Sequence, residues 1–296
     1  LEILKTLYGA CKLVILDEPT ASLTPQEVDS LFTTINAMVK SGLSVIIISH
    51  KLDEILKISD RIVVLRQGEV VSTIAKIDAN KDDLAELIVG RKIFRPEKKE
   101  TIPTQKILAL TNISSQPSSG SPMGLKQLNL NLYGGEIHGV AGVSGNGQKA
   151  LCELIAGHIT PKIGSLEFNN ISINQFNAKK FMDLGIAYIP EDRNLDGIIG
   201  DMSVLENSIL SEMDNPTIKS SFGVLRSNKC ELYSKKLCSE NDVRTQSIHQ
   251  PARLLSGGNV QKLLIGRWLQ RNPKVIIACQ PTRGLDEGAI SAVHGM

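Results

Sequence analysis

The sequence lacks any long run of apolar residues. No stretch approaches the roughly 18 apolar residues that a membrane-spanning helix needs, and no secretory signal pattern is visible. It also lacks an excess of either charge, because 33 Lys and Arg face 31 Asp and Glu. A net charge of +2 does not favour nucleic acid or lipid headgroups as partners. Any membrane attachment would therefore need partner subunits.

Cysteine is scarce, and no pair has the C-x-x-C spacing of a redox or metal motif. The five cysteines are scattered and odd in number, which suits a reducing compartment such as the cytosol. Cys152 falls inside an expected helix and Cys279 at the end of an expected strand. Both are therefore predicted to be buried thiols.

The stretch LVILDEPT, residues 13–20, is the most informative part of the chain. Its four apolar residues predict a buried parallel strand, which Pro19 ends. Asp17 and Glu18 lie at the carboxyl end of this strand, where ligands bind in open α/β sheets. One carboxylate can hold Mg²⁺ while the other orients and deprotonates an attacking water. The alternative is an acidic loop after a core strand.

A second apolar run, residues 45–48, is followed by Ser49 and His50. A helix expected over residues 25–39 joins the two runs, so the unit is predicted to be βαβ with neighbouring parallel strands. His50 would then lie beside Glu18, where an imidazole can contact a terminal phosphate and the water that attacks it. The alternative is a solvated or capping histidine.

Together, LDEPTASLTPQE and IISHKLDEI resemble the Walker B, D-loop and switch-histidine segments of an ATP-binding-cassette (ABC) ATPase. The resemblance implies that Asp17 is the Mg²⁺ ligand, Glu18 the catalytic glutamate and His50 the switch histidine. It also places the D-loop at residues 22–24, although Thr24 departs from the usual aspartate.

The first unit is expected to end with a hairpin and a helix, and a second copy of the pattern follows a linker. Residues 61–70 predict a hairpin that turns at Gln67 and Gly68, and a helix is expected over residues 81–89. A charged linker without periodicity comes next. New strands are then expected to begin at residues 107, 128 and 137, the last covering residues 137–141.

The octapeptide GVSGNGQK, residues 142–149, has the glycine spacing of a phosphate-binding loop ahead of a helix. Backbone N–H groups of such a loop wrap a phosphate. Gln148 stands where Lys should reach the phosphates, and Lys149 stands where Ser or Thr should hold Mg²⁺. A degenerate nucleotide site is therefore predicted at Gly142, Ser144, Gly145, Asn146, Gly147, Gln148 and Lys149.

The string LSGGNVQ, residues 255–261, precedes an amphipathic helix expected to run to about Arg271. Ser256, Gly257 and Gly258 at a helix N-terminus can bind an anion, and the alternative is an N-cap and a flexible turn. The string resembles the ABC signature motif. That resemblance also makes Gln261 a candidate nucleotide contact.

The strand expected over residues 275–278 repeats the Walker B pattern with altered chemistry. Cys279 and Gln280 stand where Asp17 and Glu18 stand in the first copy. The string IPEDR places Glu191 at the usual glutamine position of the Q-loop. The second copy therefore retains a signature but lacks the ligands and the base for fast hydrolysis.

The resemblance implies an α/β fold built from two tandem partial P-loop NTPase cassettes of ABC type, each a mixed sheet with helices and with antiparallel β and helical subdomains. We expect residues 1–92 to form the C-terminal part of a first cassette, 93–106 a linker, and 107–296 a degenerate, C-terminally truncated second cassette. Two whole cassettes need about 500 residues. The chain is therefore expected to be an internal fragment or gene remnant, inactive alone.

The strings GVSGNGQ, IPEDR, LSGGN and QPTRGLD resemble tandem ATPase subunits of bacterial importers for simple sugars and nucleosides, with GNGQ leaning toward nucleosides. The resemblance implies ATP and Mg²⁺ as cofactors and a peripheral position on the cytoplasmic face of the membrane. It implies transmembrane permease subunits and a periplasmic or lipid-anchored substrate-binding protein as partners, and no nucleic acid. In this family each ATP lies between the P-loop and Walker B of one cassette and the signature of the other.

Two alternatives stay open. A tandem cassette ATPase that acts on ribosomes shares the DEPT and signature segments, although it usually has two intact sites and a long helical linker. A truncated, inert product is the non-enzymatic alternative. The stretch 114–122 is rich in serine and has no aromatic residue to stack on adenine, which argues against tight adenine binding at the second site.

Overall fold

The computed structural model describes residues 11–20, 23–90, 92, 101–117, 123–143 and 145–296. Its internal contacts divide the chain into two units. The first comprises Leu1–Pro96 together with Gly284–Gly295, and the second comprises Glu97–Arg283. Of the residues singled out above, Ser22 and Ser144 lie outside the described residues.

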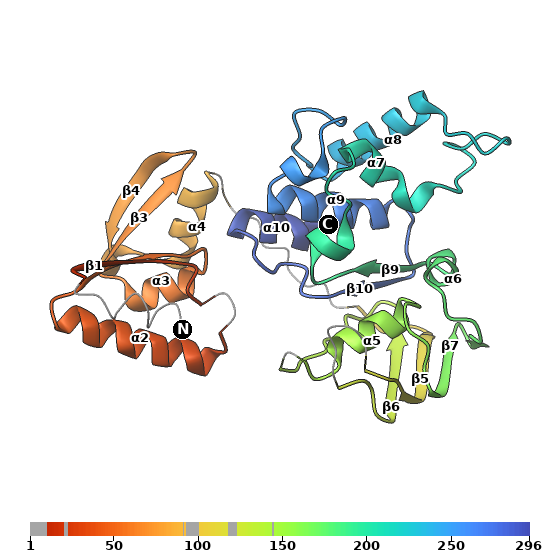
Figure 1. Cartoon of the computed structure of the whole chain (residues 1–296), viewed down its shortest axis with the longest axis horizontal. Helices are drawn as coiled ribbons and strands as arrows, with labels where there is room; N and C mark the ends of the chain where they lie inside the picture. The colour runs from red at the N-terminus through yellow and green to blue at the C-terminus, as the bar shows by residue number, and fades with distance from the viewer. Residues whose placement is uncertain (1–10, 21–22, 91, 93–100, 118–122, 144) are drawn as a thin grey trace. The chain divides into compact units, whose positions relative to one another are not determined.

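The first unit contains the expected βαβ arrangement (Figure 1). Strands β1 (Leu13–Asp17) and β2 (Ser44–Ile48) pair in parallel, and α2 (Pro25–Lys40) connects them. Phe32 and Ile35 of α2 pack against the inward side chains of β1. The predicted parallel neighbours are therefore confirmed.

The prediction that β1 is a buried strand was wrong for one of its faces. Val14 and Leu16 are buried, whereas Leu13 and Ile15 are 50% and 60% exposed. Successive strand residues face opposite sides of a sheet, and α2 covers only one side. Among the described residues nothing buries the outward row of β1.

The rest of the first unit is a hairpin with short helices. Gln67 and Gly68 both have positive φ, 54° and 84°, which suits the tight two-residue turn predicted there. Apolar side chains of the hairpin and of the helices over residues 52–58 and 81–89 form one small core, which includes Leu52, Val64 and Leu84. The elements are α3 (Leu52–Ile58), β3 (Arg61–Arg66), β4 (Glu69–Ala75), η1 (Lys76–Asp78), α4 (Lys81–Val89) and α10 (Glu287–Gly295).

The second unit begins with an antiparallel sheet in the order β6-β5-β7-β8. Its strands are β5 (Lys106–Ser114), β6 (Leu128–Tyr133), β7 (Ile163–Phe168) and β8 (Ile171–Ser172). Helix α5 (Gln148–Ile155) packs its apolar side on this sheet, where Leu151 and Leu154 join the core of Leu108 and Leu110. This packing fixes the position of the helix that follows the glycine-rich loop.

A parallel pair and a helical region complete the second unit. Strand β9 (Ile186–Ile189) pairs with β10 (Val275–Ala278), register Ile189 with Ala278. Arg267 is buried in the helical region, where its guanidinium donates to the carbonyls of Gly197 and Asn207, and burial lowers the pKa of Arg267 to about 10. The helices are α6 (Ala178–Asp183), η2 (Arg193–Gly197), α7 (Val204–Ile209), η3 (Leu210–Glu212), α8 (Ser227–Glu240), η4 (Ala252–Leu254) and α9 (Gly257–Leu269).

The strand predicted over residues 137–141 was wrong, because this segment is irregular. Ile137 and Val140 are 83% and 54% exposed, and the described strands of the unit pair with one another instead. An isolated apolar stretch cannot form a ladder without a neighbouring strand. The glycine-rich loop therefore follows irregular backbone rather than a strand.

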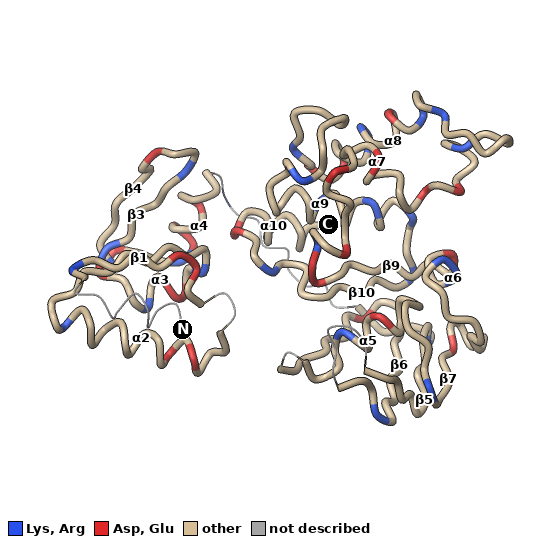
Figure 2. Tube along the Cα trace, in the orientation of Figure 1, with Lys and Arg blue, Asp and Glu red and all other residues tan. Residues whose placement is uncertain are grey.

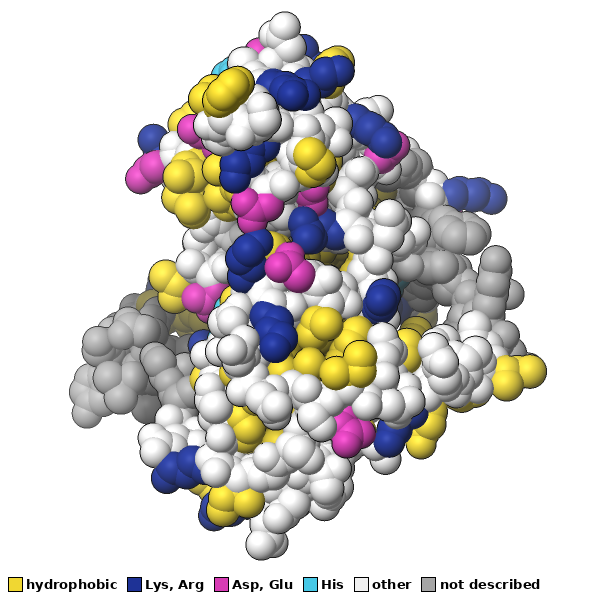
Figure 3. Space-filling view, turned by 90° about the vertical axis from the view of Figure 1, so that its right-hand side faces the viewer, with side chains coloured by type: hydrophobic (Ala, Val, Ile, Leu, Met, Phe, Trp, Pro, Cys, Tyr) yellow, Lys and Arg dark blue, Asp and Glu magenta, His cyan; other side chains and the backbone are white. Residues whose placement is uncertain are grey.

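The surface carries mixed charges, as the near-neutral composition predicts. Acidic and basic residues are interspersed along the trace in Figure 2. Figure 3 shows one face where apolar side chains lie among Lys, Arg, Asp and Glu. Within the residues that the structure describes, no helix combines the length and apolarity needed to cross a membrane.

Candidate functional site

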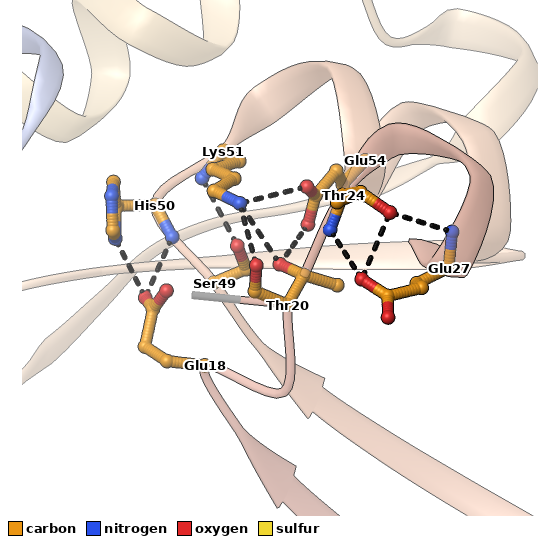
Figure 4. Close-up of polar contacts among 8 residues, drawn as sticks. All are labelled: Glu18, Thr20, Thr24, Glu27, Ser49, His50, Lys51 and Glu54. Carbon is orange, nitrogen blue, oxygen red and sulfur yellow. Dashed lines mark hydrogen bonds and ion pairs between the residues drawn. The ribbon is translucent and has the colours of Figure 1, made fainter. Parts of the chain in front are cut away.

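The end of β1 brings Glu18 and His50 into direct contact (Figure 4). Glu18 Oε1 lies 2.8 Å from Nδ1 of His50 and accepts a second hydrogen bond, of 3.0 Å, from the His50 backbone N–H. The Glu18 N–H in turn donates to the carbonyl of Ile48, at 2.9 Å. Parallel pairing of β1 with β2 thus places the carboxylate and the imidazole at one sheet edge.

Glu18 has one carboxylate oxygen left for chemistry. Its Oε2 is buried and has no hydrogen-bond partner among the described residues. A buried polar atom without a partner costs about 1–3 kcal/mol, so this oxygen is poised to accept a hydrogen bond. The other carboxylate oxygen, Oε1, is held by its two contacts with His50. The arrangement can orient a water molecule and accept its proton.

Asp17 precedes Glu18 and is exposed at the end of β1. No group of three or more potential metal ligands occurs among the described residues. Mg²⁺ does not need one, because it commonly keeps several waters and binds through one or two carboxylates and substrate phosphates. The exposed carboxylate of Asp17 can serve as one such ligand.

A network that sequence reasoning missed secures the DEPT turn. Thr20 is 1% exposed, and its hydroxyl donates to Glu54 Oε2 at 2.5 Å. Lys51 donates to the Thr20 carbonyl at 3.0 Å and to Glu54 Oε1 at 3.1 Å (Figure 4). The available signal was the spacing of Lys51 and Glu54, one helical turn apart, immediately after His50.

Thr24 has a structural task in this unit. It is the N-cap of α2 and forms a capping box with Glu27, whose carboxylate accepts from the Thr24 N–H at 2.7 Å and its hydroxyl at 2.8 Å. These two hydrogen bonds, the backbone one foremost, lower the pKa of Glu27. The position that the resemblance assigns to the D-loop therefore starts a helix here.

The second candidate site lines a cavity of about 1290 Å³ in the second unit. Of the predicted residues, the structure brings Gly142, Gly145, Gly147, Gln148, Lys149, Glu191 and Gln280 to this cavity. Cys152 and Cys279 line it as well. They are partly buried rather than enclosed in the core, which corrects the expectation for these two thiols.

A backbone carbonyl of the glycine-rich loop is hydrogen-bonded to the side chain at the end of the same loop. Gln148 Nε2 donates to the Val143 carbonyl at 3.0 Å, and Gly142 has no side chain to displace the amide. The Asn146 N–H also donates to the Val143 carbonyl, at 3.3 Å. Lys149 pairs at 3.8 Å with Glu153 one turn along α5, so its charge is held beside the helix.

Glu191 pairs with Arg283, and both residues line the cavity. Arg193 donates to the carbonyl of Arg283 at 2.7 Å, which ties IPEDR to the segment after β10. Arg283 was not among the predicted site residues. The sequence signal that could have identified Arg283 was its positive charge three residues after Gln280, together with the acidic Glu191 at the Q-loop position.

The signature segment starts α9. Ser256 is the N-cap residue but makes no side-chain cap hydrogen bond in the described structure; its Oγ accepts from Asn259 Nδ2 at 2.9 Å. Gly257 and Gly258 form the first turn, and a Cβ on Gly257 would lie 2.8 Å from the guanidinium of Arg193. Ser256 thus occupies the N-cap position without a capping hydrogen bond, and its contact with nucleotide stays a prediction. Gln261 is 2% exposed, so it is buried rather than available to a ligand.

The sequence model of the family described as "ABC transporter" matches residues 125–283. The chain belongs to the ABC transporter family. Its match to the dimeric structure of MJ0796, a bacterial ABC transporter cassette, has a TM-score of 0.52 at 23% identity and covers 63% of this chain and 79% of that one. This likeness shows the P-loop α/β fold of ABC cassettes.

Curated members of the ABC transporter family match nearly all of the chain. It is 41% identical over 294 residues to the nucleoside import ATP-binding protein NupA of Lactococcus lactis, covering 99% of this chain and 58% of NupA. It is 42% identical to the guanosine import ATP-binding protein NupO of Bacillus subtilis, covering 99% and 57%. The ribose import ATP-binding protein RbsA of Clostridium tetani is 36% identical, with the same coverage. The chain thus spans little more than half the length of these relatives.

Proposed function

We propose that this chain is part of an ATP-binding and ATP-hydrolysing subunit of an importer for nucleosides or simple sugars. The observation that carries the proposal is the Glu18 carboxylate, held by His50 at the end of a parallel strand with its second oxygen unpaired. The substrate classes come from the names of the relatives, which are import ATP-binding proteins for nucleosides, guanosine and ribose.

The hydrolytic step would use three side chains of the first unit. Glu18 Oε2 would orient the attacking water and take its proton. His50 would hold Glu18 in position and contact the terminal phosphate. Asp17 would hold Mg²⁺, which neutralises charge on the phosphates of ATP when bound. The contact of Glu18 with His50 supports the first two roles, and the exposed position of Asp17 at the end of the same strand supports the third.

The cavity of the second unit would bind nucleotide without fast hydrolysis. Gln280 lacks the charge and basicity of a glutamate, and Cys279 offers no oxygen ligand to Mg²⁺. Gln148 must leave the Val143 carbonyl before the loop can wrap a phosphate. Gly142, Gly145 and Gly147 line the cavity and would supply backbone donors there, with Lys149 and Glu191 also at its lining. The roles expected for Ser144 and Asn146 stay predictions.

We further propose that residues 1–92 and 107–296 are partial copies of one cassette, joined by residues 93–106. Glu18 and Gln280 have the same φ of 46°, and each follows a parallel strand and precedes Pro-Thr. Ser256, Gly257 and Gly258 would contact ATP held by another cassette. Their partly open position beside Arg193 supports this role, whereas burial of Gln261 does not favour a direct contact by that residue.

The implied partners are transmembrane permease subunits and a substrate-binding protein, with the ATPase on the cytoplasmic face of the membrane. The test is uptake into proteoliposomes that contain the permease and a polypeptide as long as the curated relatives. We expect ATP-dependent uptake of a labelled nucleoside or of ribose. Uptake that continues without the ATPase, or ATP turnover with no uptake of either class, would contradict the proposal.

A further inference from the structure

Two thiols from distant parts of the sequence meet at the cavity of the second unit. Cys152 lies in α5, and Cys279 directly follows β10. Their side chains are hydrogen-bonded to each other, and both pack against the core that includes Tyr188. We propose that Cys152 and Cys279 are a modification site, at which a peroxide converts the two thiols into a reversible intramolecular disulfide.

An oxidant can reach this pair. Both sulfurs belong to residues that line the cavity of about 1290 Å³ and are partly accessible. Cys230 and Cys238 in α8 are only 3% and 8% exposed and do not line the cavity. The second unit thus contains an accessible pair of thiols and two enclosed thiols for comparison.

The two thiols have unequal roles. The hydrogen bond from Cys152 lowers the pKa of Cys279, and the hydroxyl of Tyr188 acts in the same direction. Burial and the carboxylates of Glu191 and Glu153 oppose this shift. The same thiol contact, aided by burial, raises the pKa of Cys152. Because the thiolate is the reactive form, the proposal takes Cys279 as the nucleophile and Cys152 as the resolving thiol.

The reaction balances with one peroxide molecule per disulfide. The Cys279 thiolate attacks one oxygen of hydrogen peroxide, the O–O bond breaks, and a sulfenic acid and hydroxide form. The Cys152 sulfur then attacks the Cys279 sulfur, and the S–O bond breaks. The two thiol protons combine with the two hydroxide groups released, so that two molecules of water leave. Both sulfurs are oxidised and both peroxide oxygens are reduced to water. A dithiol reductant reverses the change.

The disulfide would tie α5, which carries the glycine-rich loop, to the end of β10. Its sulfurs would be about 2 Å apart, so the two walls of the cavity could no longer separate. Under the proposed function, oxidation would weaken nucleotide binding in this cavity. That consequence rests on the proposed function, whereas formation of the disulfide does not.

The test treats the 296-residue chain with hydrogen peroxide and maps disulfides by mass spectrometry of a non-reducing digest. We expect one cross-linked peptide pair, containing Cys152 and Cys279, that disappears with dithiothreitol. Cys152→Ser and Cys279→Ser should each abolish it, and the matched Cys230→Ser and Cys238→Ser should retain it. In Cys152→Ser, dimedone should label Cys279 as a sulfenic acid.

The outcomes separate the two proposals. If both thiols remain open to alkylation after peroxide treatment, while circular dichroism shows a folded chain, the disulfide is refuted. Cross-links to other cysteines instead of this pair would refute it as well. Binding of a fluorescent ATP analogue is measured on the reduced and oxidised chain. Absence of binding in both, with the disulfide formed, contradicts only the proposed nucleotide site.

Discussion

At the end of β1, Glu18 has a φ of 46°, and at the end of β10, Gln280 has the same value. A non-glycine residue in this left-handed region is unfavourable by about 1–2 kcal/mol. Glu18 is charged and contacts His50, whereas Gln280 has no charge. The shared backbone therefore belongs to the turn before Pro-Thr, and it is not by itself a sign of catalysis.

The side chains around the two turns separate the regions more clearly. The β1 turn has a carboxylate, an imidazole and a partly buried network of Thr20, Lys51 and Glu54. Beside the β10 turn lie two thiols in contact, and the Val143 carbonyl of the nearby glycine-rich loop accepts a hydrogen bond from Gln148. The two regions thus share a backbone conformation, but among the described residues only the first carries a carboxylate paired with an imidazole.

The largest expected effect is that of Glu18→Gln. In a polypeptide as long as the curated relatives, this change should lower steady-state ATP hydrolysis about 10²–10⁴-fold, because it removes a general base while retaining shape. ATP binding, measured by equilibrium dialysis, should change little. Turnover close to that of the unchanged protein would place the base elsewhere and end the contrast between the turns.

His50→Ala should have the next largest effect, lowering hydrolysis by about 10²-fold. It removes the 2.8 Å contact at Nδ1 but keeps the backbone N–H that also holds Glu18, and small misplacements of reacting groups can cost that much. The measurement is kcat at saturating ATP. The double variant with Glu18→Gln should lose less than the product of the two single effects, since the part of the His50 effect that acts through Glu18 is already lost.

A smaller effect is expected at the two matched helix caps. Thr24 with Glu27 in the first unit and Ser203 with Glu206 in the second both form capping boxes. Thr24→Ala and Ser203→Ala should each lower the free energy of unfolding by about 1 kcal/mol, measured by urea titration. A large loss of ATPase in Thr24→Ala, without loss of stability, would instead favour a functional D-loop contact.

The two capping boxes also predict how the destabilisation caused by each alanine changes with pH. Hydrogen bonds from Thr24 lower the pKa of Glu27, and those from Ser203 lower the pKa of Glu206, each from 4.5. A carboxylate whose pKa is lower in the folded protein than in the unfolded chain stabilises the fold at pH values above its unfolded-state pKa. That contribution is lost as the pH falls through the folded-state pKa. The destabilisation by each alanine should therefore shrink below about pH 4.

The smallest effect is expected for Gln280→Glu. Restoring the carboxylate should leave hydrolysis within about twofold, because Cys279 and Gln148 still supply no Mg²⁺ or phosphate ligand. The measurement is ATP turnover beside Glu18→Gln and the double variant. Recovery of turnover in the double variant would show that the second turn needs only its charge.

The strongest sequence predictions were those set by local pattern. Apolar runs with a polar end predicted the β1–α2–β2 unit and hence the Glu18–His50 contact, and Gln67-Gly68 predicted the hairpin. Residues 137–141 have the same apolar character but no neighbouring strand in the described structure. Pattern gives the tendency of a segment, whereas its partners decide whether a strand forms.

Tertiary contacts account for the rest of the site. Three contacts could not be read from the sequence, because the spacing of the paired residues along the chain follows no helix or strand period. They are the hydrogen bond from Gln148 to Val143, the ion pair of Glu191 with Arg283 and the contact of Cys152 with Cys279. The clustering of Gly284–Gly295 with the first unit is of the same kind. The assignments of role at Asp17, Ser256 and the glycine-rich loop stay predictions.

The alternating burial of β1 and β2 has a practical consequence for handling the protein. Leu13, Ile15, Ile46 and Ile48 form an outward row of branched side chains that are 48–60% exposed. A flat aliphatic strand surface of this kind recruits other chains. The purified chain should therefore be prone to concentration-dependent aggregation, and a solubilising fusion partner or low protein concentration would help keep it in solution.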